Sequence, residues 1–353
     1  MNAALLFAAL LTIKTPDLQP VLHDMRVAQD VPGVSAVVIR RNEIIFAGAS
    51  GVADIATGRP MTADTVLYIG SVSKVLTAIL ALQLVETNTL ALDDPVTAIA
   101  VDAPDDMQPV RVSHLLTHSA GLEREGDFTY WYTADFPDRR SLANYLEGVQ
   151  LRAIPGRDLH YSNVGYAALG LVIERATGQS YGKALRSRVL EPLSMNASGA
   201  PGPAANVANG YTPSGGMLPN AKRPFAGVAE RVGTRHVRMY HDARAMSPAF
   251  GAYASASDLA RLANFLLGHG GDAVLSRKMR ERMRERQDSG WGLGLKLQHI
   301  GERPIARHDG WFAAHRTHLL LAAEDDIAIV VLANSDSAEP KRIAEALLAA
   351  VIN

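Results

Sequence analysis

Strand-forming runs stand at both ends of this chain, with helical patterning between them, and this order limits the fold more than any other feature. The runs are rich in β-branched and apolar residues and cover 33–40, 43–48, 292–299, 303–308, 317–323 and 327–333. A helical pattern over 339–352 follows them. Because strands joined by short turns pair antiparallel, we expect both ends to share one antiparallel sheet flanked by helices.

This order predicts an α/β (α+β) fold built from two lobes. Residues 16–70 and 251–353 form the α/β lobe, and residues 71–250 form a mainly helical lobe whose loops rim a cleft. The loop segments 123–138 and 199–249 are rich in Gly, Pro and aromatic residues. Four aromatic side chains are candidates for lining the cleft, three in these segments and one beyond them, and each could instead pack in the interior: Tyr130, Trp131, Tyr132 and Trp311.

A serine and a lysine three residues apart mark the junction of the two lobes. A short strand over 65–69 ends at Gly70, and the apolar spacing after it predicts a helix beginning at Ser71. Residues three apart share a helix face, so the Ser71 hydroxyl and the Lys74 amine point to the same place. Serine is a weak nucleophile unless a neighbour accepts its proton. We therefore interpret Ser71 as a nucleophile, Lys74 as its partner, and the Ser71 N–H as an oxyanion donor.

The same spacing recurs at Ser180 and Lys183, within a Gly-x-Ser-x-Gly pattern typical of a nucleophile elbow. Such an elbow needs a buried strand before the serine. Residues 164–176 show helical spacing instead, and Thr177 with Gly178 is typical of a helix end. We interpret Ser180 as the N-cap of the next helix, not as a nucleophile.

Two triplets complete the pattern, Tyr-Ser-Asn at 161–163 and His-Asp-Gly at 308–310. The preceding Pro-Gly and polar residues predict that Tyr161 and Asn163 are exposed just ahead of the helix over 164–176. A lysine ammonium nearby favours the phenolate, so Tyr161 is interpreted as a proton shuttle. Gly310 suits a strand whose backbone a substrate approaches closely.

Together these motifs resemble the serine β-lactamase and penicillin-binding-protein superfamily, in the class C-like branch that includes family VIII carboxylesterases and D-aminopeptidases. The resemblance covers about residues 18–353 and also rests on the stretches at 31–33, 92–96, 114–122 and 161–170. It implies a β-lactamase-like fold, Ser71 as the acylated nucleophile, and Lys74 with Tyr161 as the acid/base pair. It also implies that Asn163 contacts substrate or Lys74, and that Trp311 supplies a second oxyanion N–H.

The third motif departs from the lysine-threonine-glycine pattern that holds a substrate carboxylate in the β-lactamases. A histidine with an ordinary pKa is mostly neutral at pH 7, and an adjacent aspartate repels an anion. We therefore expect His308, Asp309 and Gly310 to line a site for small uncharged esters. Arg316 leaves an alternative open, because its guanidinium, turned into the site, restores the positive charge that a carboxylate substrate needs.

The predicted activity is that of a serine hydrolase, most simply a carboxylesterase that works through a Ser71 acyl-enzyme on a small-molecule substrate. A β-lactamase, D,D-peptidase or D-aminopeptidase is the alternative, and amide turnover distinguishes it. A catalytically silent, penicillin-binding-like sensor or scaffold is the second alternative. Which of Lys74 and Tyr161 acts as the resting base is open at this point, because the sequence shows neither burial nor charge contacts.

The composition limits partners and cofactors. At 353 residues and 48% hydrophobic, the chain buries a large core, and its net charge of −1 indicates neither nucleic acid nor an anionic membrane as partner. No cysteine is present, and the histidines lack the spacing of metal ligands, so neither metal nor organic cofactor is predicted. The basic run 277–286 is interpreted as a solvated helix with one apolar edge. The histidines interpreted as structural or pocket-lining are His114, His118, His315 and His318.

The first fifteen residues form a separate apolar segment. The run over 3–13 has the length of a signal-peptide core and is too short to span a bilayer. No positive residue precedes it and no small-residue cleavage motif follows. It favours export to the periplasm over a cytoplasmic location, and a first helix packed on the fold is the alternative.

Overall fold

The computed structural model describes residues 16–352, apart from 97–106, 108, 128–129, 134, 203–206, 214–228, 234 and 240–241. Of residues 132 and 133 only the backbone is described. The predicted leader at 1–15 and the side chain of Tyr132 therefore lie outside the described part.

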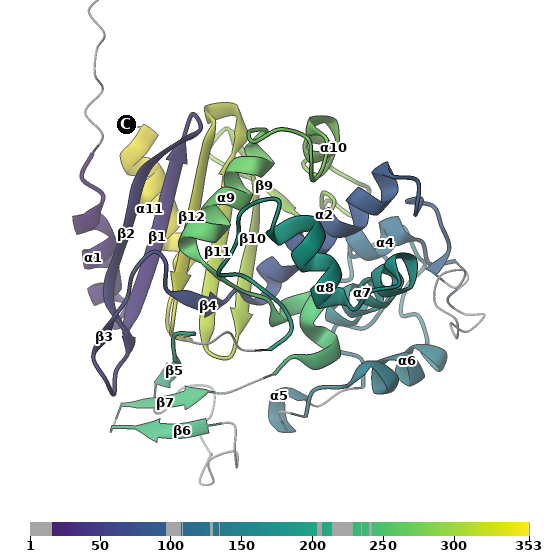
Figure 1. The fold of residues 1–353 in the computed structure, drawn as a ribbon, viewed down its shortest axis with the longest axis horizontal. Coiled ribbons are helices and arrows are strands. Elements are labelled where there is room, and N and C mark those ends of the chain that lie inside the picture. The colour runs from purple at the N-terminus through teal and green to yellow at the C-terminus, as the bar shows by residue number, and fades with distance from the viewer. Residues whose placement is uncertain are drawn as a thin grey trace, which may run out of the picture.

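Both ends of the chain meet in one antiparallel sheet, as the sequence predicts (Figure 1). Its central pair joins β1 (Gly33–Arg40) to β12 (Ile327–Ala333), with Val34 opposite Ala333. Among the described residues the sheet has seven strands, in the order β3-β2-β1-β12-β11-β10-β9. The remaining strands are β2 (Glu43–Asp54), β3 (Arg59–Pro60), β9 (Lys296–Ile300), β10 (Arg303–Phe312) and β11 (His315–Ala322).

Helices cover both faces of this sheet, because its central strands are buried on both sides. Along β12, Ile329 and Val331 face the cluster that contains α1 (Gln19–Ala28) and α11 (Pro340–Ile352). Val330 and Leu332 alternate to the other face and join the larger core with α9 (Ala256–Leu267). Strands buried on two faces need continuous apolar runs, which explains the composition of β12.

The helical part of the molecule packs beside the β9 edge of the sheet (Figure 1). Its central helix is α2 (Ser73–Glu86), which is apolar on all sides and buried over most of its length. The helices α7 (Asn163–Thr177) and α8 (Tyr181–Leu185) pack against it. The other helices of this part are α4 (Val112–Leu116), α5 (Tyr130–Thr133), α6 (Arg139–Glu147) and α10 (Arg277–Arg282). The lobe boundaries at 70/71 and 250/251 stay a prediction.

Small strands also occur within and beside the mainly helical region. Two short strands, β4 (Val66–Tyr68) and β8 (Tyr253–Ser255), pair with each other next to the start of α2. A three-stranded sheet at the bottom of Figure 1 contains β5 (Gly210–Pro213), β7 (His236–Met239) and β6 (Ala229–Val232). The predicted rim segment 199–249 thus carries this sheet in its described part.

One local prediction was wrong, and another was right only in part: the run 277–286 contains the helix α10, with Met279 and Met283 packed on the core. The strand predicted over 292–299 begins only at Lys296, because Gly294 has a positive φ of 83° and turns the chain close to Ala78 of α2. The basic run after Ser276 is not simply solvated, since the Arg280 side chain is buried. Its guanidinium donates to the carbonyl oxygens of Phe265 and His269, both at 2.9 Å, and so ties α10 to the end of α9.

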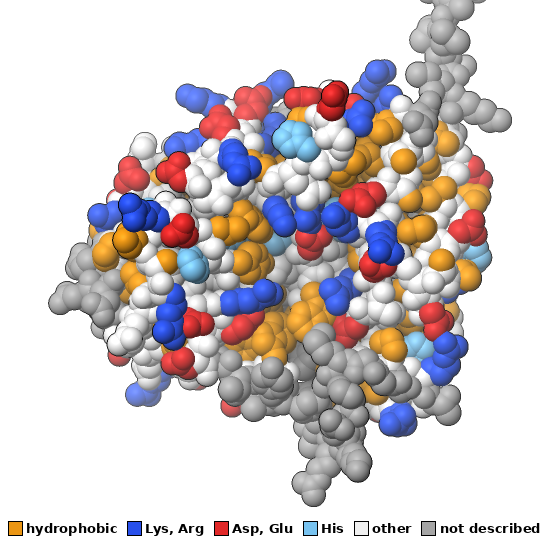
Figure 2. Space-filling model, turned by 180° about the vertical axis from the view of Figure 1, so that it is seen from behind, with side chains coloured by type: hydrophobic (Ala, Val, Ile, Leu, Met, Phe, Trp, Pro, Cys, Tyr) orange, Lys and Arg blue, Asp and Glu red, His pale blue; other side chains and the backbone are white. Residues whose placement is uncertain are grey.

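Figure 2 shows the opposite face of the molecule, where acidic and basic side chains are interspersed. In the described part of the chain, no helix is both long and apolar enough to cross a bilayer. The described residues also contain no group of three or more side chains arranged to hold a metal ion.

Candidate active site

Ser71 lies in a tight turn between β4 and α2, rather than in the α-helix itself as predicted. The turn is a 3-10 helix, Gly70–Val72, whose first hydrogen bond runs from the Val72 N–H to the Ile69 oxygen at 3.2 Å. The Ser71 N–H precedes that bond and has no acceptor within the turn. Ser73 braces the turn, since its hydroxyl donates to the Gly70 oxygen at 2.6 Å and accepts from the Ala252 N–H at 3.0 Å.

The Lys74 amine is buried and has three partners. Nζ lies 3.2 Å from Ser71 Oγ, 2.7 Å from Asn163 Oδ1 and 2.7 Å from the Ala249 carbonyl oxygen. The predicted Ser71–Lys74 pair therefore forms. Ala249 belongs to the helical turn Ser247–Gly251, which sequence reasoning did not connect to the site.

The Tyr-Ser-Asn triplet meets this pair from the start of α7. Ser162 is the N-cap of α7, and its hydroxyl accepts from the Gly165 N–H at 2.8 Å. Asn163 is the first helical residue and is buried, not exposed as predicted. The ring of Tyr161 lies 4.9 Å from Lys74 Nζ, and its hydroxyl is hydrogen-bonded to Ser71. The triplet thus places a phenol and an amide oxygen on either side of the Ser71–Lys74 pair.

Burial decides the charge states of both candidate bases. It holds the pKa of Lys74 well below the ordinary 10.5, and the nearby carboxylate of Glu125 opposes this only in part. Burial also raises the pKa of Tyr161, although its hydrogen bond to Ser71 acts in the opposite direction. The expectation that the lysine charge makes Tyr161 easier to deprotonate was therefore wrong. Both shifts favour the neutral amine together with the neutral phenol.

The three hydrogen-bond partners of Lys74 can be shared out around a neutral amine. A neutral amine has two N–H donors and one lone pair, whereas an ammonium has three donors. The Ala249 carbonyl and the Asn163 amide oxygen take the two N–H groups. With the amine neutral, as the lowered pKa of Lys74 favours, its lone pair is left for Ser71, the one partner of the three that has a hydroxyl proton to give.

An aromatic group formed by His118 and Trp291 supports Tyr161. His118 stacks on the Tyr161 ring with centroids 4.1 Å apart, and Trp291 lies 5.6 Å from the same ring. The Nδ1 atom of His118 accepts from the Ser162 N–H at 3.1 Å. Burial lowers the pKa of His118 well below its ordinary value, so the ring stacks as a neutral imidazole. The interpretation of His118 as pocket-lining agrees with this position.

The other histidines interpreted as structural also have local partners. His114 Nδ1 accepts from the Arg111 N–H at 3.2 Å at the start of α4. His315 Nε2 lies 3.0 Å from the Ala208 oxygen, and His318 Nδ1 lies 2.7 Å from an oxygen of Asp309.

The third motif places His308 and Asp309 on opposite faces of β10. The His308 ring lies 6.5 Å from the Tyr161 ring, on the active-site side. Burial lowers the pKa of His308 to about 3, helped by the nearby Lys74. The Asp309 carboxylate instead pairs with Arg307 and with His318 on the neighbouring strand. The predicted repulsion of anions by Asp309 is thus largely neutralised within the sheet.

Two glycines allow β10 to approach the serine turn. Gly70 has a positive φ of 52°, and a Cβ there would overlap the backbone nitrogen of Trp311. A Cβ on Gly310 would overlap the carbonyl oxygen of Ile69. The close approach brings the Trp311 N–H beside the Ser71 turn, where the resemblance implies the second oxyanion donor.

We expect Gly310→Ala to lower kcat for ester hydrolysis by about 10²-fold with a smaller effect on KM, because the added methyl pushes Trp311 away from Ser71. Steady-state kinetics on a chromogenic ester checks this. Gly148→Ala is the matched control, since a Cβ there meets nothing within 4 Å. Equal kcat values for both variants would contradict the placement of the oxyanion donor.

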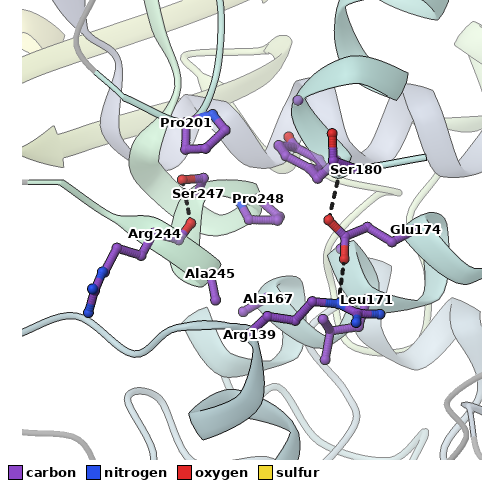
Figure 3. A pocket seen from close by; sticks show the side chains of 13 residues that line it. Arg139, Ala167, Leu171, Glu174, Ser180, Pro201, Arg244, Ala245, Ser247 and Pro248 are labelled. Atoms are coloured by element: carbon purple, nitrogen blue, oxygen red, sulfur yellow. Dashed lines mark hydrogen bonds and ion pairs between the residues drawn. The ribbon is translucent and has the colours of Figure 1, made fainter.

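The second Ser-x-x-Lys motif is structural, as the sequence indicates. Gly178 ends α7 with a φ of 66°, and Ser180 occupies the N-cap position of α8. The side chains of Ser180 and Lys183 are exposed. Ser180 lines a cavity of about 110 Å³ in which Glu174 pairs with Arg139 (Figure 3). That cavity contains none of Ser71, Lys74 and Tyr161.

The main residue that sequence reasoning missed is Glu125. Its carboxylate accepts from Asn163 Nδ2 at 2.8 and 3.0 Å and also accepts from the Tyr130 hydroxyl. Glu125 stands in an irregular segment between α4 and α5, where no periodic pattern marks it. Its only sequence signal is its place in the aromatic-rich segment 123–138.

The fold and this constellation define the class of serine β-lactamases and penicillin-binding proteins. The chain belongs to the beta-lactamase family, whose model matches residues 18–353. This confirms the resemblance and the β-lactamase-like fold inferred from the motifs.

Curated relatives and solved structures agree with this membership. Esterase EstB of Burkholderia gladioli is 36% identical over 183 residues, which are 47% of this chain and 46% of the relative. Penicillin-binding protein 4 of Amycolatopsis lactamdurans is 35% identical over 181 residues, 49% and 46% of the two chains. The chain thus spans about half the length of the curated relatives it matches. The D-amino acid amidase from Ochrobactrum anthropi SV3, complexed with D-phenylalanine, shares the fold, with a TM-score of 0.79, 24% identity, and 95% and 98% coverage.

Proposed function

We propose that this protein is a serine hydrolase that acylates Ser71, and that its substrates are small uncharged esters. The observation that carries the proposal is the 3.2 Å approach of Lys74 Nζ to Ser71 Oγ, with the other two amine partners being obligate acceptors. An esterase and a penicillin-binding protein among the relatives support acyl transfer as the reaction class.

The proposed acylation follows from the geometry. The Ser71 hydroxyl proton passes to the neutral Lys74 amine as Oγ attacks the ester carbonyl carbon. The N–H groups of Ser71 and Trp311 stabilise the oxyanion. The alkoxide leaves with a proton from Tyr161, whose raised pKa keeps that proton available, and the Lys74 ammonium then returns the proton it took from Ser71 to the Tyr161 phenolate. Water then attacks the acyl-enzyme by the reverse proton path and releases the acid.

The substrate class rests on the side chains around this centre. His308 is neutral, so it offers no cation to a substrate carboxylate at the position where the β-lactamases have lysine. Trp131 and Trp311 stack with centroids 5.1 Å apart and an interplanar angle of 22°. Because both rings are partly exposed beside the oxyanion donor, they give an acyl group an apolar wall.

We expect p-nitrophenyl butyrate to be hydrolysed with at least about tenfold higher kcat/KM than the p-nitrophenyl monoester of glutaric acid. The carboxylate of the glutaric ester would enter the site without a cation at position 308 to pair with, and one missing charged contact has about this effect. The preference should persist from pH 8 down to pH 5, because the pKa of His308, about 3, leaves its ring neutral throughout. Initial rates across this range test both points. Faster turnover of the anionic ester would overturn the proposed substrate class.

A peptidase or amidase that recognises a free carboxylate is the second candidate, and Arg316 is the observation that favours it. The Arg316 guanidinium lies 5.6 Å from the Trp311 ring, and its buried Nε has no partner among the described residues. If this cation holds the substrate, Arg316→Gln selectively lowers turnover of the anionic ester. Equal effects on both esters would remove the second candidate.

A further inference from the structure

Glu125 is fixed beside the catalytic residues by the start of α7. The carbonyl oxygen of Arg124 accepts from the Asn163 N–H at 2.7 Å, and that of Glu123 accepts from the Ser162 hydroxyl at 2.6 Å. These bonds hold the backbone on both sides of the glutamate. The buried Tyr130 hydroxyl then donates to one carboxylate oxygen. Glu125 is therefore held by the fold rather than by solvent.

The carboxylate determines which way the Asn163 amide points. An amide presents one acceptor and one donor end, and the two ends are nearly equal in size. An ionised carboxylate is acceptor-only, so it binds the Nδ2 end, here at 2.8 and 3.0 Å. The Oδ1 end must then face Lys74, which it meets at 2.7 Å. In the flipped orientation the amide N–H would compete with Ser71 for the amine lone pair.

We propose that Glu125 is a positioning residue that, through the amide of Asn163, keeps the Lys74 lone pair free for the Ser71 proton. This rests on the proposed function, since it deepens the account of the same acylation step. A glutamine at 125 removes the constraint, because its own amide can donate to Asn163 and allow the flip.

Glu125 also acts on Lys74 through its charge. The charged and titratable groups that surround the amine come from several elements. Arg124 and Glu125 lie in the segment before α5, His118 follows α4, Tyr161 and Tyr166 flank the start of α7, and His308 lies on β10. Of these, Glu125 is the one whose negative charge favours the protonated amine. Removing that charge lowers the pKa of Lys74 further.

The test is Glu125→Gln measured by the pH dependence of kcat and KM for p-nitrophenyl butyrate. We expect kcat to fall about a hundredfold with KM little changed, because the fault lies in proton transfer and not in binding. The acidic limb of the kcat profile should move to lower pH. Glu123→Gln is the matched control, because the Glu123 carboxylate pairs with Arg152 at the surface, at 2.6 Å, and should leave both quantities unchanged.

Glu125→Asp keeps an acceptor-only carboxylate and separates the two effects. We expect it to retain the wild-type acidic limb with a fall in kcat smaller than that of Glu125→Gln. Wild-type kcat and an unmoved limb in Glu125→Gln would overturn the inference alone, and if that variant does not fold, an acidic limb moved away from the wild-type position in Glu125→Asp would do so. Wild-type protein without ester turnover or Ser71 acylation would instead overturn the proposed function.

Discussion

Ser71→Ala is expected to abolish ester hydrolysis, with kcat for p-nitrophenyl butyrate falling by about 10⁴-fold or more. The variant keeps the oxyanion N–H groups, Lys74 and Tyr161, but no atom remains to form the acyl-enzyme. Residual rate enhancement can then come only from binding and oxyanion stabilisation. Intact-mass analysis after brief exposure to substrate should show an acyl adduct on the wild type and none on the variant.

Ser180→Ala supplies the matched control, since it alters the serine of the second Ser-x-x-Lys motif. Both side chains of that motif are exposed, and Ser180 stands at the start of α8, outside the candidate active site. We expect wild-type turnover and a wild-type adduct from it. Loss of activity in Ser180→Ala with retention in Ser71→Ala would reverse the assignment of the nucleophile. A stable Ser71 adduct without turnover would favour the sensor or scaffold alternative over a hydrolase.

The sequence predicted the fold well where burial follows a simple period. β1 and β12 occur at the predicted residues because strands buried on both faces leave unbroken apolar runs. The prediction of helix α7 was equally clear, since Gly178 marks its end and takes the left-handed conformation that glycine favours. Periodicity failed at 292–295, where Gly294 turns the chain against α2 although the local composition resembles a strand.

The candidate site was predictable only as far as its motifs. Spacing along a helix brings Ser71 and Lys74 together, so their contact could be inferred without a structure. Glu125 and His118 act through packing between segments that are distant in sequence, and neither stands at a marked spacing from Asn163 or Tyr161. The charge states depended on burial, which reversed the expectation for Tyr161.

Lys74→Arg is expected to lower kcat by about 10³-fold or more, as much as Lys74→Ala does. Arginine keeps the positive charge but cannot release its proton in a protein, so it cannot accept the proton of Ser71. The wild-type rate should rise with pH through the lowered pKa of Lys74, because the amine is protonated and inactive below that value. The plateau is therefore expected well below pH 10.5, the ordinary pKa of lysine.

The comparison of the two variants separates a base from an electrostatic role. If the positive charge of Lys74 merely stabilised a Tyr161 phenolate, arginine would retain much of the activity that alanine loses. The buried site argues against that, since burial raises the pKa of Tyr161 while it lowers that of Lys74. Lys183→Arg, at the exposed second motif, controls for the substitution itself and should leave turnover unchanged. Activity in Lys74→Arg close to that of the wild type would transfer the role of resting base to Tyr161.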